Sequence, residues 1–164
     1  IARALVNDPE MILLDEPTTG LDPQARHLLW ERLYRLKEQG VTLLLTTHYM
    51  DEAEQLADRL VIMDHGKIVA EGSPAELITH HTTREVVELR FDDGEHDATA
   101  LAPVVAAAGL RVDELPDRHL VYADDGDALI AHLHESGVRP LGTYVRRSSL
   151  EDVFLTLTGR SLVE

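Results

Sequence analysis

The stretch Met11-Ile12-Leu13-Leu14-Asp15-Glu16-Pro17 decides the fold of the first half of the chain. Four apolar residues follow one another, and a run that is apolar on both faces is typical of a strand buried in a parallel sheet. Two carboxylates come directly after the run. Because ligands of open α/β sheets bind beyond the carboxyl ends of the strands, Asp15 and Glu16 are predicted to lie at the edge of a binding site. A solvated acidic turn after a strand is the alternative.

A second buried strand is predicted over 41–46, and it leads into Thr46-Thr47-His48. Between the strands, Asp22-Pro23 has the pattern of an N-cap and a first helical residue, and the helix is expected to continue to Gln39. The histidine ring can donate and accept hydrogen bonds, so His48 can contact a phosphate or orient a water. A structural histidine is the alternative for this position.

The rest of the chain predicts two domains, 1–79 and 80–164, that meet at the polar segment His80-His81-Thr82-Thr83. The first also contains a helix over 51–57, a hairpin of strands 60–64 and 67–70 about His65-Gly66, and a helix opened by a Ser73–Glu76 capping box. The second has the order βαββαβ, which is typical of a ferredoxin-like α+β sandwich. Its expected elements are strand 85–91, helix 100–108, strands 110–115 and 119–123, helix 127–136, strand 140–146 and helix 149–158.

The last of these helices is expected to begin with a Ser148–Glu151 capping box. Its apolar face is predicted to consist of Leu150, Val153, Phe154 and Leu157. In the helix that follows Asp22, Trp30 and Tyr34 lie one turn apart and are interpreted as core packing or as sheltering of the core.

Composition excludes several classes of function. The 164 residues include no cysteine, which excludes disulfides, cysteine-bound zinc and thiol catalysis. The net charge of −15 repels a phosphate backbone, so no nucleic-acid partner is expected. The longest apolar runs have four or five residues and are far shorter than a membrane span.

Three ordered motifs resemble the ATP-binding cassette (ABC) ATPases. The stretch from Leu13 to Pro23 looks like the Walker B strand running into the D-loop of that family, and Thr46 to Glu54 looks like its switch-histidine segment. Met63 to Ile68 and Glu71 to Pro74 look like the elements that close the family's nucleotide-binding domain. The resemblance covers residues 1 to about 79 and implies an α/β fold, the C-terminal part of a P-loop NTPase-type domain, followed by the small ferredoxin-like accessory domain.

The resemblance implies a role for each matching residue, with ATP and Mg²⁺ as cofactors. Asp15 would coordinate Mg²⁺ through water, and Glu16 would act as general base on the attacking water. His48 would bind the γ-phosphate and position that water. Asp22 would belong to the nucleotide-binding loop that crosses the interface of an ATPase dimer.

The sequence departs from the family in what it lacks. The only Gly-Lys pair, Gly66-Lys67, is followed by Ile68 and not by Ser or Thr, so the Walker A motif is absent. The glutamine loop and the Leu-Ser-Gly-Gly signature are absent too, and Ile1 to Leu5 resembles the helix that follows that signature. We therefore expect a C-terminal fragment of an ATPase that is inactive alone.

The segment Ser149 to Gly159 looks like the tail of drug-export cassette ATPases of the daunorubicin/doxorubicin-resistance type, and polysaccharide, nodulation-factor and sodium exporters share parts of it. This implies an ATPase subunit that drives efflux of a drug-like or lipophilic substrate, and a role in antibiotic resistance. Its partners would be a membrane permease and a second ATPase subunit. It would lie on the cytoplasmic face of the membrane.

Two other functions fit parts of the sequence. The ferredoxin-like half is also compatible with a ligand-sensing or dimerisation module without catalysis. A cassette ATPase of translation or DNA repair would carry the same first half, but the efflux-like tail and the charge of −15 count against it.

Overall fold

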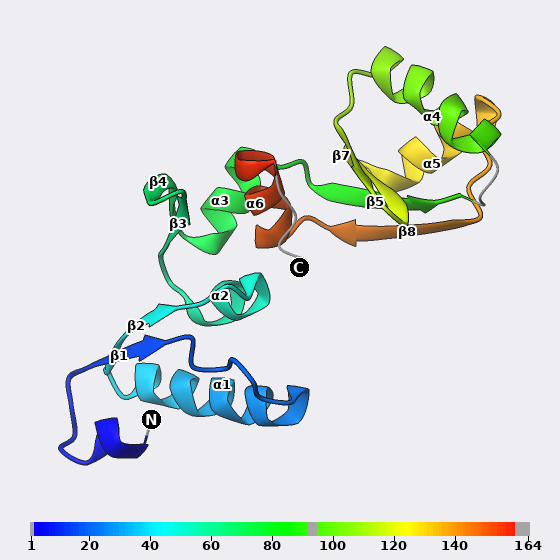
Figure 1. The fold of residues 1–164 in the computed structure, drawn as a ribbon. Coiled ribbons are helices and arrows are strands. Elements are labelled where there is room, and N and C mark those ends of the chain that lie inside the picture. Colours follow the sequence, from blue (N-terminus) through cyan, green and yellow to red (C-terminus); the bar gives the residue numbers. More distant parts are fainter. Residues whose placement is uncertain (1, 92–94, 160–164) are drawn as a thin grey trace. The chain divides into compact units, whose positions relative to one another are not determined.

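The computed structural model describes residues 2–91 and 95–159, which divide into two compact units. The second unit comprises Ala75–Leu157, and the first is built mainly from the residues up to Pro74. Figure 1 shows the helices and strands of both units. The chain has a mixed α/β fold, as the sequence predicts.

The first unit contains a parallel strand–helix–strand arrangement followed by a hairpin. After a short 3₁₀ helix, Ala2–Leu5, the elements are β1 (Met11–Asp15), α1 (Pro23–Glu38), β2 (Thr42–Thr46), α2 (Met50–Leu56), β3 (Leu60–Asp64) and β4 (Lys67–Gly72). The predicted helix cap is confirmed, because Oδ1 of Asp22 accepts a hydrogen bond of 2.9 Å from the Ala25 amide. Strands β1 and β2 pair in parallel along their whole length.

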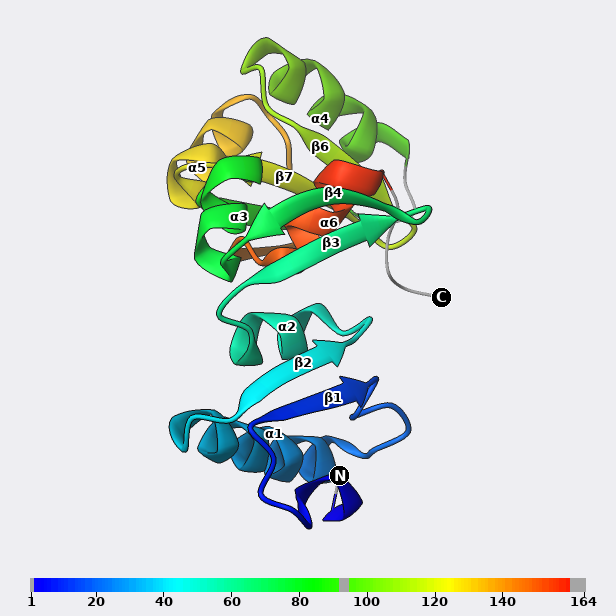
Figure 2. The same ribbon diagram turned by 90° about the vertical axis from the view of Figure 1, so that its left-hand side faces the viewer.

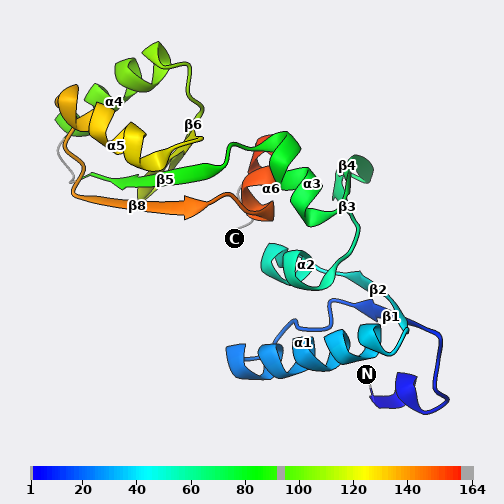
Figure 3. The same ribbon diagram turned by 180° about the vertical axis from the view of Figure 1, so that it is seen from behind.

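The sheet of β1 and β2 is covered on one face. Ile12 and Leu14 point to that face and form a buried cluster with Leu33 of α1 and Leu56 of α2. Figures 1 and 3 show α1 running along these two strands. On the other face, apolar side chains are exposed: Met11 by 57%, Leu13 by 69% and Leu44 by 61%. The prediction that these strands are buried on both faces therefore holds for one face only.

The predicted hairpin is confirmed. Strands β3 and β4 are antiparallel, and Figure 2 shows them side by side. The turn residues His65 and Gly66 have φ angles of +46° and +72°. Two positive φ values suit the right-handed twist of a two-residue hairpin, and glycine adopts such a value without steric cost.

The second unit has the predicted ferredoxin-like topology. Its elements are α3 (Pro74–His81), β5 (Glu85–Arg90), α4 (Glu95–Ala107), β6 (Val112–Leu115), β7 (Arg118–Ala123), α5 (Gly126–Glu135), β8 (Gly142–Arg147) and α6 (Leu150–Thr158). The strand order is β6-β7-β5-β8, and every neighbouring pair is antiparallel. Helix α4 begins several residues before the predicted start at residue 100.

Both faces of this sheet carry buried apolar side chains. Alternate residues of β5 and β7, among them Val87 and Val121, share one core with residues of α4 and α5. These two helices lie together on one side of the sheet (Figure 3). On the opposite face, Val86, Leu120 and Tyr122 form a second cluster with Leu155 of α6. The sheet is thus enclosed within the second unit.

Helix α6 is anchored by Asp152, not by the predicted Ser148–Glu151 box. The box is shifted by one residue, since the amide of Ser149 donates to Oδ2 of Asp152 over 2.8 Å. The same carboxylate, which is fully buried, accepts two bonds from Arg146 of β8, of 2.6 and 2.8 Å. Asp152 therefore caps the helix and ties it to the sheet.

The apolar face of α6 differs in part from the prediction. Leu150 and Val153 are fully buried, as expected. Phe154 and Leu157 are only half-buried, whereas Leu155 is buried. The prediction from a single apolar stripe misplaced the buried face of α6. Asp152 and Thr156 point toward the sheet, where Asp152 accepts a hydrogen bond from Arg146 and Thr156 accepts one from Arg111.

Glu88 on β5 belongs to the same polar network. Its carboxylate accepts hydrogen bonds of 2.8 Å from Arg118 and from Arg146. Burial works to raise the pKa of Glu88, but the bonds from Arg146 and Arg118 outweigh burial and hold the pKa below its usual value.

Candidate functional site

The carboxyl ends of β1 and β2 bring the predicted site residues to one edge. Asp15 lies opposite Thr46 in the parallel register. The Thr46 hydroxyl donates a hydrogen bond to Oδ1 of Asp15, and the amide of Glu16 donates to the Thr46 carbonyl over 3.0 Å. These bonds extend the ladder past the last residue of each strand, so the two following loops begin side by side.

Glu16 and His48 are in contact at this edge. Nδ1 of His48 lies 3.3 Å from Oε1 of Glu16, and each side chain is about half exposed, at 50% and 49%. The hydroxyl of Thr19 donates to the other carboxylate oxygen, Oε2, over 3.1 Å. The carboxylate is thereby oriented by one neighbour on each oxygen while it remains open to solvent.

The backbone of Glu16 is in the left-handed region, with φ of +43°. This conformation is uncommon for a residue with a side chain, and such residues cluster at functional sites. Two bonds from the Glu16 amide to Thr46, to its carbonyl and to its hydroxyl at 3.2 Å, hold the backbone there. The conformation turns the chain sharply after β1.

The loop between Glu16 and α1 contains the other predicted residue, Asp22. Its side chain caps α1, and the bonds of the described residues do not place it in the Glu16–His48 pair. Thr18 in the same loop was not singled out from the sequence. It is fully buried, and its hydroxyl has no hydrogen-bond partner among the described residues.

The donor atoms at this edge suit Mg²⁺ but not a whole nucleotide. Carboxylate oxygens of Asp15 and the hydroxyl of Thr46 are hard ligands of the kind Mg²⁺ prefers, and Mg²⁺ usually keeps several waters. No three His, Asp or Glu side chains in the described ranges gather into a metal site. The glycine-rich loop that would hold a triphosphate is not in the sequence.

Helix α1 supplies contacts that the sequence did not predict. Trp30 is half-buried, and its Nε1 donates to Oε1 of Glu52 over 3.1 Å. Tyr34, interpreted as core packing, is instead 51% exposed. Glu52 is fully buried although α2 is rich in acidic residues. Tertiary packing, and not a local sequence pattern, therefore sets the burial of Glu52.

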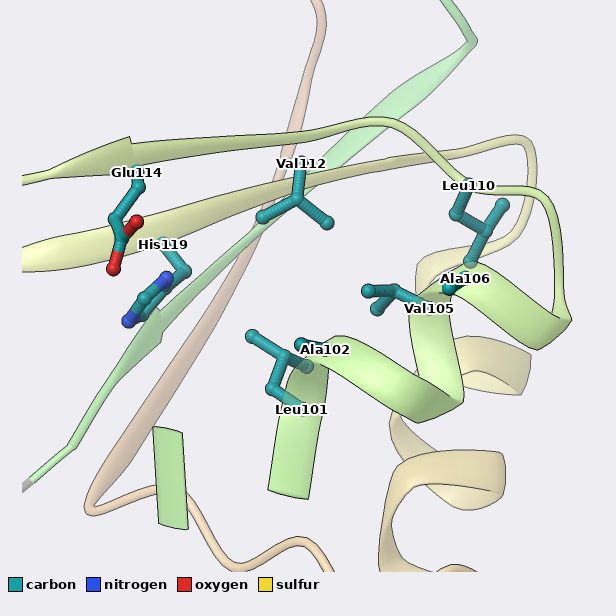
Figure 4. Close-up of a pocket in the computed structure, with 8 residues that line it drawn as sticks. All are labelled: Leu101, Ala102, Val105, Ala106, Leu110, Val112, Glu114 and His119. Carbon is teal, nitrogen blue, oxygen red and sulfur yellow. The ribbon is translucent and has the colours of Figure 1, made fainter. Parts of the chain in front are cut away.

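The second unit contains a hollow of about 330 Å³ between α4 and the strands β6 and β7 (Figure 4). Most of its lining is apolar: Leu101, Ala102, Val105, Ala106, Leu110 and Val112. Glu114 and His119, which are cross-strand partners, lie together at one end. Neither side chain forms a hydrogen bond or an ion pair with another residue of the described ranges.

None of the described helices combines the length and apolar character that a membrane crossing requires.

Two family models match separate parts of the chain. The model of the C-terminal domain of the nodulation factor export protein NodI matches residues 97–159. A model described as an AAA domain, putative AbiEii toxin of a type IV toxin–antitoxin system, matches residues 1–50.

Curated relatives match both parts at once. The Nod factor export ATP-binding protein I of Ralstonia nicotianae is 48% identical over 99% of this chain and 50% of its own length. The protein of the same name from Cupriavidus metallidurans is 47% identical over 99% of this chain and 52% of its own length. The chain thus spans about half the length of the curated relatives it matches.

Among solved structures, the ADP conformation of MJ1267, an ATP-binding cassette of an ABC transporter, is 38% identical over 45% of this chain and 29% of that one, with a TM-score of 0.42. The name shared by the curated relatives is not that of a daunorubicin/doxorubicin-type drug exporter, the subtype that the tail predicted. Over nearly its whole length, the chain is therefore similar to Nod factor export ATP-binding proteins.

Proposed function

We propose that the chain is the C-terminal part of the ATP-hydrolysing subunit of an ABC export system. The observation that carries the proposal is the pair of Glu16 and His48, 3.3 Å apart, at the carboxyl ends of adjacent parallel strands. The identity of 45–48% to Nod factor export ATP-binding proteins supports it. Residues 1–79 would supply the ATPase motifs and 80–164 the accessory domain.

In this proposal, each residue at the edge has a task that its position allows. Glu16 accepts a proton from a water, because its carboxylate is oriented by Thr19 and His48 yet open to solvent. His48 fixes that carboxylate and presents its other ring nitrogen to a phosphate. Asp15 holds Mg²⁺ through water, and the bound ion would neutralise phosphate charge. Asp22 caps α1 and belongs to the loop that meets a second ATPase subunit.

The direct test is Glu16→Gln in the full-length protein that contains this chain. A positioned general base contributes about 10²- to 10⁴-fold, so turnover should fall by that factor while ATP binding persists. Glu151→Gln, an exposed change in the second unit, is the matched control and should leave turnover unchanged. Near-normal hydrolysis by the Glu16→Gln protein would contradict the proposed role.

The chain by itself, without a Walker A loop, is proposed to be inactive. Most contacts to the polyphosphate would come from glycine-rich backbone that the sequence lacks. Calorimetric titration of residues 1–164 with Mg-ATP should show no tight binding. Tight binding would mean that another part of the chain cradles phosphate.

The partners and the cargo are also proposals. A membrane permease and a second copy of the ATPase would complete the exporter, which would place the chain on the cytoplasmic face of the membrane. The relatives are named for Nod factor export, whereas the tail predicts a drug-like or lipophilic substrate. Deleting the gene should abolish secretion of one of these two classes, and resistance assays would separate them.

The second unit supports a further candidate, a ligand-binding module. The hollow in Figure 4 is apolar along its length and ends at Glu114 and His119, which favours a small amphiphile with a protonated amine. Titrating residues 1–164 with octylamine tests this, with octanoate as the ligand of opposite charge. Binding of octylamine alone, weakened by Glu114→Gln, would support the module; equal binding of both would contradict it.

A further inference from the structure

We propose that one face of α1, through the Trp30–Glu52 pair, is the device that positions His48 against Glu16. The inference rests on the proposed function, because it concerns how the two proposed reacting groups are held in contact. Trp30 and Glu52 are positioning residues in this view.

The local support of His48 is a single turn, in which the Tyr49 amide donates to Oγ1 of Thr47 over 3.0 Å. His48 lies between the end of β2 and the start of α2, and α2 has only seven residues. A helix of two turns is marginal on its own. Its N-cap residue, Tyr49, makes no side-chain capping bond. The place of α2, and with it the direction of the His48 segment, must therefore be fixed from outside the helix.

Helix α1 supplies that support from a single face. Four residues spaced by four, three and four positions share this face and all contact α2 or its flanks: Arg26, Trp30, Leu33 and Lys37. At the far end, Nζ of Lys37 donates to the Leu56 carbonyl over 2.7 Å and to Asp58 over 2.9 Å. In the middle, Leu33 and Leu56 share the apolar core.

The end of this face nearest to His48 is polar. The Arg26 guanidinium lies 4.3 Å from the centre of the Tyr49 ring, and one of its nitrogens lies 3.8 Å from Oδ2 of Asp51. The Tyr49 ring is itself 4.1 Å from the His48 ring. A chain of contacts thus runs from α1 through Tyr49 to His48.

Glu52 is the most informative member. It is fully buried, its Oε1 accepts from Trp30, and its Oε2 has no partner among the described residues. An apolar side chain of similar volume would avoid the cost of a half-satisfied buried carboxylate. The carboxylate instead makes the contact directional. Its hydrogen bond with Trp30 fixes the rotation of α2 about its own axis, whereas apolar packing alone would let the helix slide.

The geometry also links the two loops of the site. Helix α1 starts at the Asp22 cap, six residues after Glu16, and α2 starts two residues after His48. A clamp between α1 and α2 therefore sets the separation of the segments that follow β1 and β2. A misplacement of about 1 Å can cost about 10²-fold in rate, so loosening the clamp should reduce turnover strongly.

The test uses three variants of the pair and one control. Trp30→Phe keeps the aromatic bulk and removes the donor, and Glu52→Leu removes the acceptor and keeps the volume. Glu52→Gln retains an oxygen that can accept from Trp30 and is the conservative rescue. Glu31→Gln is the control, because Glu31 is an exposed residue of α1 and does not belong to the set of four residues that contact α2 or its flanks.

In the full-length protein, Trp30→Phe and Glu52→Leu should each lower kcat by roughly 10- to 100-fold with little change in KM. The double variant should lose no more than either single one, because both break the same contact. Glu52→Gln and Glu31→Gln should stay near wild type. Glu52→Leu should also unfold at the same temperature as wild type or higher, which separates positioning from stability.

A second readout does not depend on ATP. In residues 1–164, the NMR signals of the His48 ring should shift in Trp30→Phe and Glu52→Leu and stay in place in Glu31→Gln. Unmoved His48 signals, or an unchanged kcat in folded Glu52→Leu protein when Glu16→Gln is inactive, would overturn the positioning role. A full-length Glu16→Gln protein that remains active would instead overturn the proposed function. The NMR result would then decide by itself whether the Trp30–Glu52 pair positions His48.

Discussion

The β1–β2 sheet and the four-stranded sheet of the second unit differ in how far their apolar faces are covered. The parallel pair β1–β2 covers one face and leaves Leu13 and Leu44 more than 60% exposed on the other. The antiparallel sheet of the second unit buries Val86, Val87 and Val121 completely and is packed on both faces. The candidate catalytic edge is thus carried by the less enclosed sheet, whereas the more enclosed sheet has the covered core of a unit that is stable by itself.

The largest expected difference between the two units concerns whether each one folds when it is expressed alone. Residues 75–159 should unfold in one cooperative transition, because their core is complete. Residues 1–74 should bind a hydrophobic dye or aggregate, because exposed apolar faces and strand edges promote association. Circular dichroism melts and dye fluorescence check both. A cooperative, dye-free 1–74 together with an unfolded 75–159 would reverse the assignment.

Asp152→Ala should have the next largest effect, and only on the second unit. Removing one partner of a buried ion pair costs about 3–5 kcal/mol. Here the change would also uncap α6 and leave Arg146 with Glu88 as its remaining carboxylate partner. Denaturant unfolding of 75–159 measures the loss. The matched control is Asp127→Ala at the start of α5, which should cost much less, since Asp127 is exposed and forms no ion pair within the described part of the chain.

A pair of identical substitutions sharpens the contrast between the sheets. Leu89→Ala, at a position with 0% exposure in the second unit, should cost about 2–5 kcal/mol. Leu13→Ala, at 69% exposure in the first unit, should change stability by no more than about 0.5 kcal/mol. Chemical denaturation of residues 1–164, followed by probes in each unit, gives both values. Equal losses would show that the exposed face is covered in solution.

The smallest expected effect is a dependence on acid pH. The pKa of Glu88 is lower in the folded unit than in the unfolded chain, because the bonds from Arg146 and Arg118 outweigh burial. A group of this kind contributes stability that is present above its unfolded pKa, near 4.5, and is lost as the pH falls through the folded pKa. Unfolding free energies of 75–159 between pH 6 and pH 3 should therefore decline, and less steeply in Glu88→Gln.

Much of this architecture could be predicted because local signals were strong. Asp22-Pro23, His65-Gly66 and the apolar run before Asp15 are strong local signals, and the order of elements predicted the ferredoxin-like topology. The adjacency of Asp15, Glu16 and His48 followed from the rule that parallel strands end at one edge. The roles of these residues stay predictions.

The features that escaped prediction depend on tertiary contacts. The burial of Glu52 requires Trp30, which is 22 residues away. The face of α6 depends on which acidic residue meets Arg146, and the sequence offers both Glu151 and Asp152. No periodicity distinguishes these choices, because each is decided by a partner on another element.

The left-handed backbone of Glu16 makes stability and turnover competing properties at one position. Holding a residue with a Cβ at φ of +43° costs about 1–2 kcal/mol, which glycine would largely avoid. A glycine there would relax the loop and remove the carboxylate in the same step. Under the proposed role, selection for stability alone would favour glycine at this position, and selection for hydrolysis would retain glutamate.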